Sequence, residues 1–203
     1  MIRYLVFTCI VGISLSSESF AQTWKPLFNG KDLSGWHTQP GGKWDVRDEV
    51  IVGTSPKSEA RHGLLVSDKR FRNFVLRTKF RVTQGNSGLY FRAEETDSTV
   101  AVRGFQAEVD ATSAVGGLYE TSMRGWVQKP DPELIESLVE HGQWVSMLVT
   151  AIGHDVTVSI NGKTVTELIG DKLSLKEGHI ALQLHGGMDM YVEFKDIAIL
   201  ELP

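Results

Sequence analysis

Residues 86–110 read NSGLYFRAEETDSTVAVRGFQAEVD, and this stretch decides the fold prediction. Two runs within it, residues 87–93 and 104–110, alternate apolar and polar side chains, which is the period-two pattern of a β-strand. The apolar positions, expected on one face of each strand, are Leu89, Phe91, Ala93, Phe105, Ala107 and Val109. The polar positions, expected on the opposite face, are Tyr90, Arg92, Gln106, Glu108 and Asp110. The stretch therefore predicts two half-buried strands, whose polar faces form either a ligand site or the solvated face common in antiparallel sheets.

The rest of the chain repeats this pattern of short strands between turn residues. Residues 73–83 alternate most clearly, and the Asn-Gly pairs at 29–30 and 161–162 are strong turn signals. Asp131 and Pro132 suit the N-cap and the first position of one short helix, which continues over residues 133–140. Many short strands with one short helix predict an all-β sandwich or jelly roll in a single domain.

The N-terminal residues have the features of a secretory signal. A positively charged start precedes an apolar run at 4–15, and Ser-Phe-Ala at 19–21 resembles a cleavage site. We therefore expect residues 1–21 to be a signal peptide and residues 22–203 to form the mature domain, secreted or periplasmic. The single cysteine, Cys9, lies in the signal, so the mature chain has no thiol. The net charge of −4 gives no electrostatic case for a nucleic-acid partner, or for a membrane partner after signal removal.

A third strand adds polar groups to those of residues 86–110. Residues 178–185 alternate, with Gln183 and His185 on the polar face. If the three strands share a sheet, their amides, carboxylates and imidazole converge on one face and suit a polyhydroxyl ligand. Aromatic rings that can cover the C–H faces of a sugar are Trp36, Tyr119 and Trp126. Taken alone, Trp36 favours a role as a core anchor, because aromatic residues mainly serve packing.

Other chemistries fit the sequence less well. It contains no P-loop, dinucleotide fingerprint or nucleophile-elbow serine. Glu108, Asp110 and His185 are residue types that ligate divalent cations, so a cation site is an alternative, although their spacing does not require one and we assign no metal ligand. The histidines expected at the surface or in loops, without a function, are His62, His141, His154 and His179.

Several motifs together resemble the 3-keto-disaccharide hydrolase family, also described as 3-keto-glucoside 1,2-lyase/2-hydroxy-glucal hydratase domains. The most specific is LFNGKDLSGW at 27–36, which resembles the opening of that family. The supporting motifs are NSGLYFR at 86–92, GFQAEVD at 104–110, GLY at 117–119, NG at 161–162 and QLHG at 183–186. The resemblance covers residues 24–202.

The resemblance implies a concanavalin-like jelly roll and a role in bacterial sugar metabolism. It also implies cleavage of 3-keto-glycosides, by abstraction of the C2 proton, elimination of the C1 substituent and hydration. His185 would then be the base or the acid, and Arg92 would stabilise the enolate or orient the sugar. Glu108 and Asp110 would supply the complementary acid or base, or hold a cation. The residues expected to bind the sugar are Gln106, Gln183, Tyr90, Asn86, Trp36, Tyr119 and Trp126.

Three departures from the family pattern keep other functions open. Glu120 stands where a small or apolar residue is expected, Leu184 stands where an acidic one is expected, and residues 122–140 look peculiar to this chain. The main alternative is a noncatalytic carbohydrate-binding jelly roll, and a structural domain of a cell-surface assembly is a third. Classical two-carboxylate glycoside hydrolysis by Glu108 and Asp110 is also open. It is less favoured because these residues lie close together along one strand, whereas such enzymes need their carboxyls about 5 to 9 Å apart.

Overall fold

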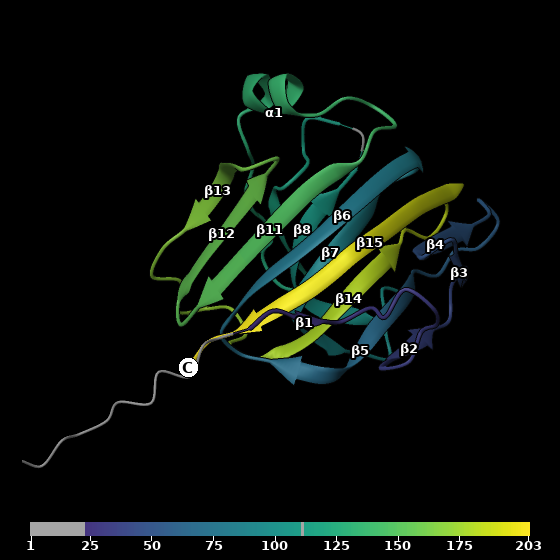
Figure 1. Ribbon diagram of the computed structural model, residues 1–203, viewed down its shortest axis with the longest axis horizontal. Coiled ribbons are helices and arrows are strands. Elements are labelled where there is room, and N and C mark those ends of the chain that lie inside the picture. Colours follow the sequence, from purple (N-terminus) through teal and green to yellow (C-terminus); the bar gives the residue numbers. More distant parts are fainter. Residues whose placement is uncertain (1–22, 111) are drawn as a thin grey trace, which may run out of the picture.

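The computed structural model describes residues 23–110 and 112–203, so the expected signal peptide and Cys9 lie outside the described residues. Two antiparallel sheets, called sheet A and sheet B here, pack face to face (Figure 1). Sheet A contains, in spatial order, β13 (Lys163–Leu168), β12 (Asp155–Ile160), β11 (Val145–Ile152), β6 (Phe74–Gln84), β15 (Met190–Glu201), β4 (Val50–Ser55) and β3 (Lys43–Arg47), with β1 (Lys25–Pro26) paired to β15. Sheet B contains β10 (Gly125–Gln128), β9 (Leu118–Thr121), β8 (Val102–Val109), β7 (Ser87–Glu95), β14 (Gly178–Leu184), β5 (Gly63–Phe71) and β2 (Trp36–Gln39). The predicted jelly-roll sandwich is confirmed.

The core lies between the sheets and is built from the apolar faces that the alternation predicted. Leu89 and Phe91 of β7 are fully buried, and Phe105 and Ala107 of β8 have at most 1% of their surface exposed. The Phe91 and Phe105 rings stack with centroids 5.4 Å apart. Burial of each of the leucine and phenylalanine side chains contributes about 1.5–3 kcal/mol, so these two strands are central to the stability of the sandwich.

The predicted shared face of Tyr90 and Arg92 is wrong, because β7 has a bulge between Phe91 and Glu94 that includes Arg92. The register with β8 shifts between Phe91 and Glu94, and Arg92 has a φ of +47°. A bulge inserts one extra residue and so exchanges the two faces of the strand beyond it. Ala93 consequently packs in the same cluster as Tyr90, not with Leu89 and Phe91 as the alternation alone predicts.

The single helix of the described chain, α1 (Pro132–Leu138), begins as predicted and ends two residues earlier. The Asp131 side chain caps it by accepting a hydrogen bond of 3.0 Å from the Glu133 backbone N–H, and Pro132 occupies the first turn. Ile135 is the buried helix residue of the core, and Leu138 packs against that core. Within residues 23–110 and 112–203, no helix has the length and apolar character needed to cross a membrane.

Candidate active site

The polar strands identified from the sequence are neighbours in sheet B, in the order β8, β7, β14. Tyr90 of β7 is the register partner of Gln106 on one side and of Ala181 on the other. A cavity of about 540 Å³, called the sheet B cavity here, opens on the outer face of these strands. Its lining is His62, Asn86, Tyr90, Val100, Gln106, Glu108, Tyr119, Thr121, Ser122, Trp126, Gln183 and His185. The expected convergence of amides, a carboxylate and an imidazole therefore occurs.

Glu108 is a buried carboxyl in this cavity, with 5% of its surface exposed. Its Oε1 accepts a hydrogen bond of 2.7 Å from Gln106 Nε2, and its Oε2 accepts one of 3.2 Å from Asn86 Nδ2. Burial raises the pKa of Glu108 to about 7; the neighbouring Asp110 adds to the rise, while the hydrogen bonds from Asn86 and Gln106 oppose it. Both protonation states are therefore accessible near neutral pH, as proton transfer requires.

Gly88 makes room for the amide that supports Glu108. It pairs in register with Glu108 across the β7–β8 ladder, and the Gln106 side chain lies over it. A Cβ atom at position 88 would lie 2.4 Å from Gln106 Cδ, closer than real contacts allow. The glycine of the Asn-Ser-Gly motif is therefore needed for the Gln106–Glu108 hydrogen bond.

A second hydrogen-bonded group surrounds Gln183 of β14. Gln183 Nε2 donates to His62 Nδ1 at 2.9 Å and to the Tyr90 hydroxyl at 3.1 Å, and that hydroxyl lies 2.9 Å from Thr121 Oγ1. Burial raises the pKa of Tyr90 well above its usual value, so the phenol stays protonated. Gln183 Oε1 is buried and has no hydrogen-bond partner among the described residues.

His62 is a site residue that the sequence did not indicate. It was expected in a surface loop without a function, but its ring lies 4.3 Å from that of His185, centroid to centroid, and lines the cavity. Because its Nδ1 accepts from Gln183, its proton is on Nε2. Burial, with the nearby His185, lowers the pKa of His62 to about 4, so the ring is neutral at neutral pH. An isolated histidine before a short strand carries no sequence signal for this role.

His185 lines the cavity, and among the described residues its hydrogen bond is made through Nδ1. Its Nδ1 lies 2.7 Å from the Gly186 carbonyl oxygen. A carbonyl oxygen can only accept, so Nδ1 carries the hydrogen, and Nε2 of the neutral ring holds a lone pair. His185 is thus set up as a proton acceptor through Nε2.

Three expected site residues lie outside the cavity lining. Asp110 accepts from Thr112 Oγ1 at 2.7 Å and from Asn86 Nδ2 at 3.3 Å, so it holds Asn86 in place. Trp36 is the core anchor that the sequence left as an alternative: 8% of it is exposed, and its Nε1 donates to the Leu27 carbonyl at 2.7 Å.

Arg92 is the third of these residues, and it lies at one end of the sandwich. Its guanidinium donates to the Arg72 carbonyl at 2.8 Å, to the Gly153 carbonyl at 3.0 Å and to Asn73 Oδ1 at 3.4 Å. These acceptors lie in the turns that join β5 to β6 and β11 to β12, so Arg92 ties the two sheets together. This placement follows from the bulge and does not suit the predicted stabilisation of an enolate.

Tyr119 and Trp126 form an aromatic wall at the rim of the cavity. They lie on the paired strands β9 and β10, with ring centroids 5.5 Å apart in a T-shaped arrangement. Trp126 is 41% exposed and Lys129 Nζ lies 4.8 Å from its centroid. Such a wall can cover the apolar face of a sugar ring.

The alternative cation site does not assemble from its expected ligands. Across residues 23–110 and 112–203, no group of three or more histidine, cysteine, aspartate or glutamate side chains has an arrangement that could hold a metal ion. Asp110 is turned toward Thr112 and lies outside the lining that Glu108 and His185 share. The described residues therefore give no ligand set for a cation at this site.

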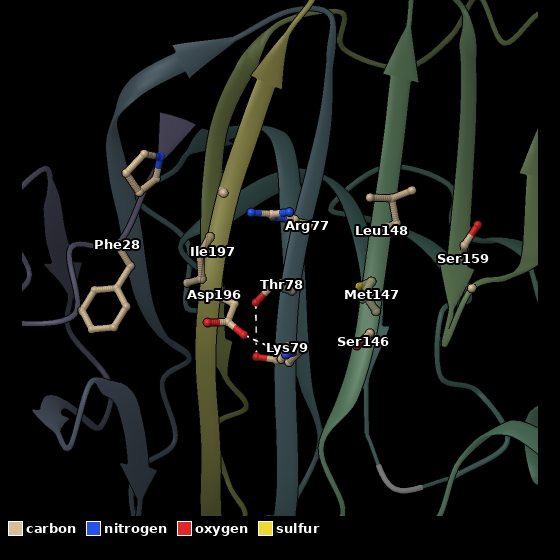
Figure 2. A pocket seen from close by; sticks show the side chains of 13 residues that line it. Phe28, Arg77, Thr78, Lys79, Ser146, Met147, Leu148, Ser159, Asp196 and Ile197 are labelled. Atoms are coloured by element: carbon tan, nitrogen blue, oxygen red, sulfur yellow. Dashed lines mark hydrogen bonds and ion pairs between the residues drawn. The ribbon is translucent and has the colours of Figure 1, made fainter. Parts of the chain in front are cut away.

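A second hollow, of about 520 Å³, lies on the outer face of sheet A (Figure 2). This sheet A hollow spans β15, β6 and β11, with Arg77 and Lys79 at its centre and Leu148 and Ser146 at one side. Its carboxylate, Asp196, forms an ion pair of 2.9 Å with Lys79. The residues that line it offer no buried acid or imidazole, so the sheet B cavity is the candidate active site.

Comparisons with known proteins bear on the family and the fold of this chain. The family model described as the 3-keto-alpha-glucoside-1,2-lyase-like domain matches residues 23–200. No curated protein sequence matches the chain. Among solved structures, a protein of Parabacteroides distasonis ATCC 8503, provisionally described as a glycosyl hydrolase, aligns with a TM-score of 0.67 and 22% identity over 89% of this chain and 94% of its own. The carbohydrate binding module CBM66 of Bacillus subtilis aligns with a TM-score of 0.61 and 17% identity over 82% of this chain and 96% of its own. At such identities these structures show the shared fold.

Proposed function

Because the chain belongs to the family of 3-keto-alpha-glucoside-1,2-lyase-like domains, we propose that it cleaves 3-keto-glycosides. Membership of this family supports a carbohydrate-related function. In the proposed reaction a base removes the C2 proton of the sugar, which the C3 ketone acidifies because the resulting carbanion is an enolate. The C1 substituent then leaves by β-elimination, and water adds across the double bond to complete a net hydrolysis.

The observation that carries this proposal is the presence of two proton-transferring groups in one cavity. His185 makes no hydrogen bond through Nε2 within residues 23–110 and 112–203, and the pKa of Glu108 is raised to about 7. In the proposed reaction, His185 Nε2 takes the C2 proton, and protonated Glu108 gives its proton to the C1 oxygen as that oxygen leaves. An acid with a pKa near the working pH is well matched to this transfer.

His62 takes the role that the sequence suggested for Arg92. Its neutral ring carries the proton on Nε2, which donates to the C3 oxygen as enolate charge develops there. Together, His185, Glu108 and His62 supply the base, the acid and the enolate donor that the reaction needs.

The test is incubation of the purified protein with a 3-keto-glucoside and with its unoxidised parent, with and without EDTA. We expect release of the aglycone from the 3-keto compound only, with the rate unchanged by EDTA. Release from the parent glycoside would instead support two-carboxylate hydrolysis, and loss of activity with EDTA would show a cation that the lining residues do not predict.

A noncatalytic carbohydrate-binding module is the second candidate, and the exposed aromatic wall of Tyr119 and Trp126 favours it. Sugar-binding surfaces use such rings without acid–base groups. Saturable sugar binding without release from either compound would support this candidate over the enzyme.

We further propose a secreted or periplasmic location, from the signal-like composition of residues 1–21. Mass spectrometry of the protein from extracellular and periplasmic fractions should give Gln22 as the first residue. Recovery of a chain that retains residues 1–21 in the cytosolic fraction would contradict this location.

A further inference from the structure

The β9–β10 hairpin, which carries one wall of the sheet B cavity, has a charged residue on its inner side. In β9 the side chains alternate, so Tyr119 and Thr121 line the cavity while Glu120 points between the sheets. Glu120 is fully buried. This is the position at which the family resemblance leads us to expect a small or apolar residue.

Glu120 belongs to an ion cluster that crosses from sheet B to the loop after β13. Its Oε2 accepts from Arg124 Nε at the turn of the hairpin. Arg124 also binds Asp171 as a fork, through Nη1 to Oδ1 at 3.0 Å and through Nη2 to Oδ2 at 2.9 Å. Asp171 is fixed in turn by the backbone N–H groups of Leu173 at 3.2 Å and Ser174 at 3.3 Å.

Two further contacts tie the ends of the same hairpin to β13 in sheet A. Thr166 Oγ1 donates to the Gly116 carbonyl at 2.8 Å, just before β9. The Glu167 backbone N–H donates to Gln128 Oε1 at 3.1 Å, at the end of β10. The hairpin ends are therefore fastened independently of the ions, and the cluster acts on the turn between them.

Stability alone does not explain a glutamate at this position. The Oε1 atom of Glu120 is buried without a partner among the described residues, and such an atom carries a desolvation cost. Replacing a buried ion pair by apolar side chains is often neutral or stabilising. What the charged cluster adds is a directional link, because a planar guanidinium donates to its carboxylates in one plane.

We propose that Glu120, Arg124 and Asp171 are positioning residues that hold the aromatic wall of Tyr119 and Trp126, and so set selectivity for glycosides long enough to reach it. This proposal rests on the proposed function for its substrate class. Glu108 and His185 act on the keto sugar itself, whereas Trp126, at the exposed rim, contacts the aglycone of a disaccharide. A small aglycone such as methyl does not extend to the rim.

The kinetic test compares a 3-keto-disaccharide with a methyl 3-keto-glucoside. The Glu120→Gln variant keeps the shape of the side chain and removes its charge. In this variant, the ratio of kcat/KM for the disaccharide to kcat/KM for the methyl glycoside should fall by roughly fivefold or more. The loss should lie in KM for the disaccharide, with both constants for the methyl glycoside nearly unchanged. The matched control is Glu193→Gln, which breaks the two-point ion pair with Arg81 on sheet A. Equal losses for both substrates, or the same ratio change in the control, would show a merely structural role.

A readout without turnover separates this proposal from the proposed function. In ¹⁵N-tryptophan-labelled protein, the indole signal of Trp126, assigned with Trp126→Phe, should shift on titration with an unoxidised disaccharide. Glu120→Gln should move that signal and weaken its response at least twofold, while the signal of buried Trp36 stays in place.

A Trp126 signal unaffected by the variant overturns the positioning role even if keto-glycosides are cleaved. Absence of cleavage with an altered Trp126 response overturns only the proposed enzyme. If Glu120→Gln does not fold, Arg124→Lys, which keeps the charge and loses the fork, is measured in the same two ways.

Discussion

The sheet B cavity and the sheet A hollow have nearly equal volumes, about 540 and 520 Å³, yet only one holds reactive groups. In the cavity, Glu108 is buried between two amide donors and His185 lies beside a second imidazole. In the hollow, Arg77 and Lys79 are exposed, Arg77 lies 4.5 Å from the Trp24 ring centroid, and Lys79 pairs with Asp196. The difference teaches that buried, hydrogen-bonded ionisable groups mark a site better than volume does.

The largest expected effect is that of Glu108→Gln. The amide keeps the shape of the side chain but cannot give up and regain a proton, so kcat on a 3-keto-glycoside should fall by about 10²-fold or more. The measurement is steady-state kinetics near pH 7, with circular dichroism to confirm folding. A folded variant with full activity would show that Glu108 is not needed for the reaction. The sheet B cavity would then no longer be distinguished from the sheet A hollow by this carboxyl.

The raised pKa of Glu108 also predicts how stability depends on pH. Its pKa rises from 4.5 to about 7 on folding, so the proton binds the folded state more tightly than the unfolded state. The resulting stabilisation is complete below pH 4.5 and is lost as pH rises through about 7, a change of ~3 kcal/mol for a shift of this size.

Urea unfolding of the wild type and of Glu108→Gln between pH 4.5 and 8 isolates this effect, because other titrating groups cancel in the difference. His62, whose lowered pKa makes folding weaker in acid, is among the groups that cancel. Parallel pH profiles of the two proteins would mean that Glu108 titrates normally and is not buried as the structure shows.

Gly88→Ala should damage the cavity without touching an ionisable group. The new methyl group meets Gln106 Cδ at 2.4 Å, and the overpacking should cost about 1–3 kcal/mol of the free energy of unfolding. The double variant Gly88→Ala with Gln106→Ala removes the clash, so it should regain stability but not activity. If stability is not regained, the clash lies in the backbone rather than in the Gln106 side chain.

Arg92→Lys tests the corrected placement of Arg92. Lysine cannot reproduce the three directed hydrogen bonds of the guanidinium, so the free energy of unfolding should fall by about 1–3 kcal/mol. The kcat of the folded variant should stay unchanged, since Arg92 lies outside the cavity lining. A loss of kcat with wild-type stability would restore its predicted role with the enolate.

The smallest expected effect is that of Arg77→Gln in the sheet A hollow. Arg77 is exposed, and surface substitutions of this kind usually change the free energy of unfolding by no more than about 0.5 kcal/mol. Thermal unfolding and kinetics on the keto-glycoside should both match the wild type. A clear loss of activity would show that the hollow takes part in the function.

The sequence by itself determined the elements and most of the cavity. Period-two alternation identified the strands, Asp131 and Pro132 gave the start of the helix, and the polar faces of three strands supplied Glu108, Gln183 and His185. These features depend on neighbours along the chain, and local periodicity reports them directly. Whether these three strands share a sheet stayed open from the sequence, and the order β8, β7, β14 meets that condition.

Only the tertiary structure decided which side chains meet. The bulge in β7 turned Arg92 away from Tyr90, because one extra residue exchanges the faces of a strand and no periodic pattern marks where that residue falls. His62 lies beside His185 because it directly precedes β5, whose first residue, Gly63, pairs with Leu184 at the end of β14. The Trp36 side chain packs in the core and donates a hydrogen bond to the Leu27 carbonyl. Contacts between residues distant in sequence depend on packing and strand register, which local patterns of polarity do not encode.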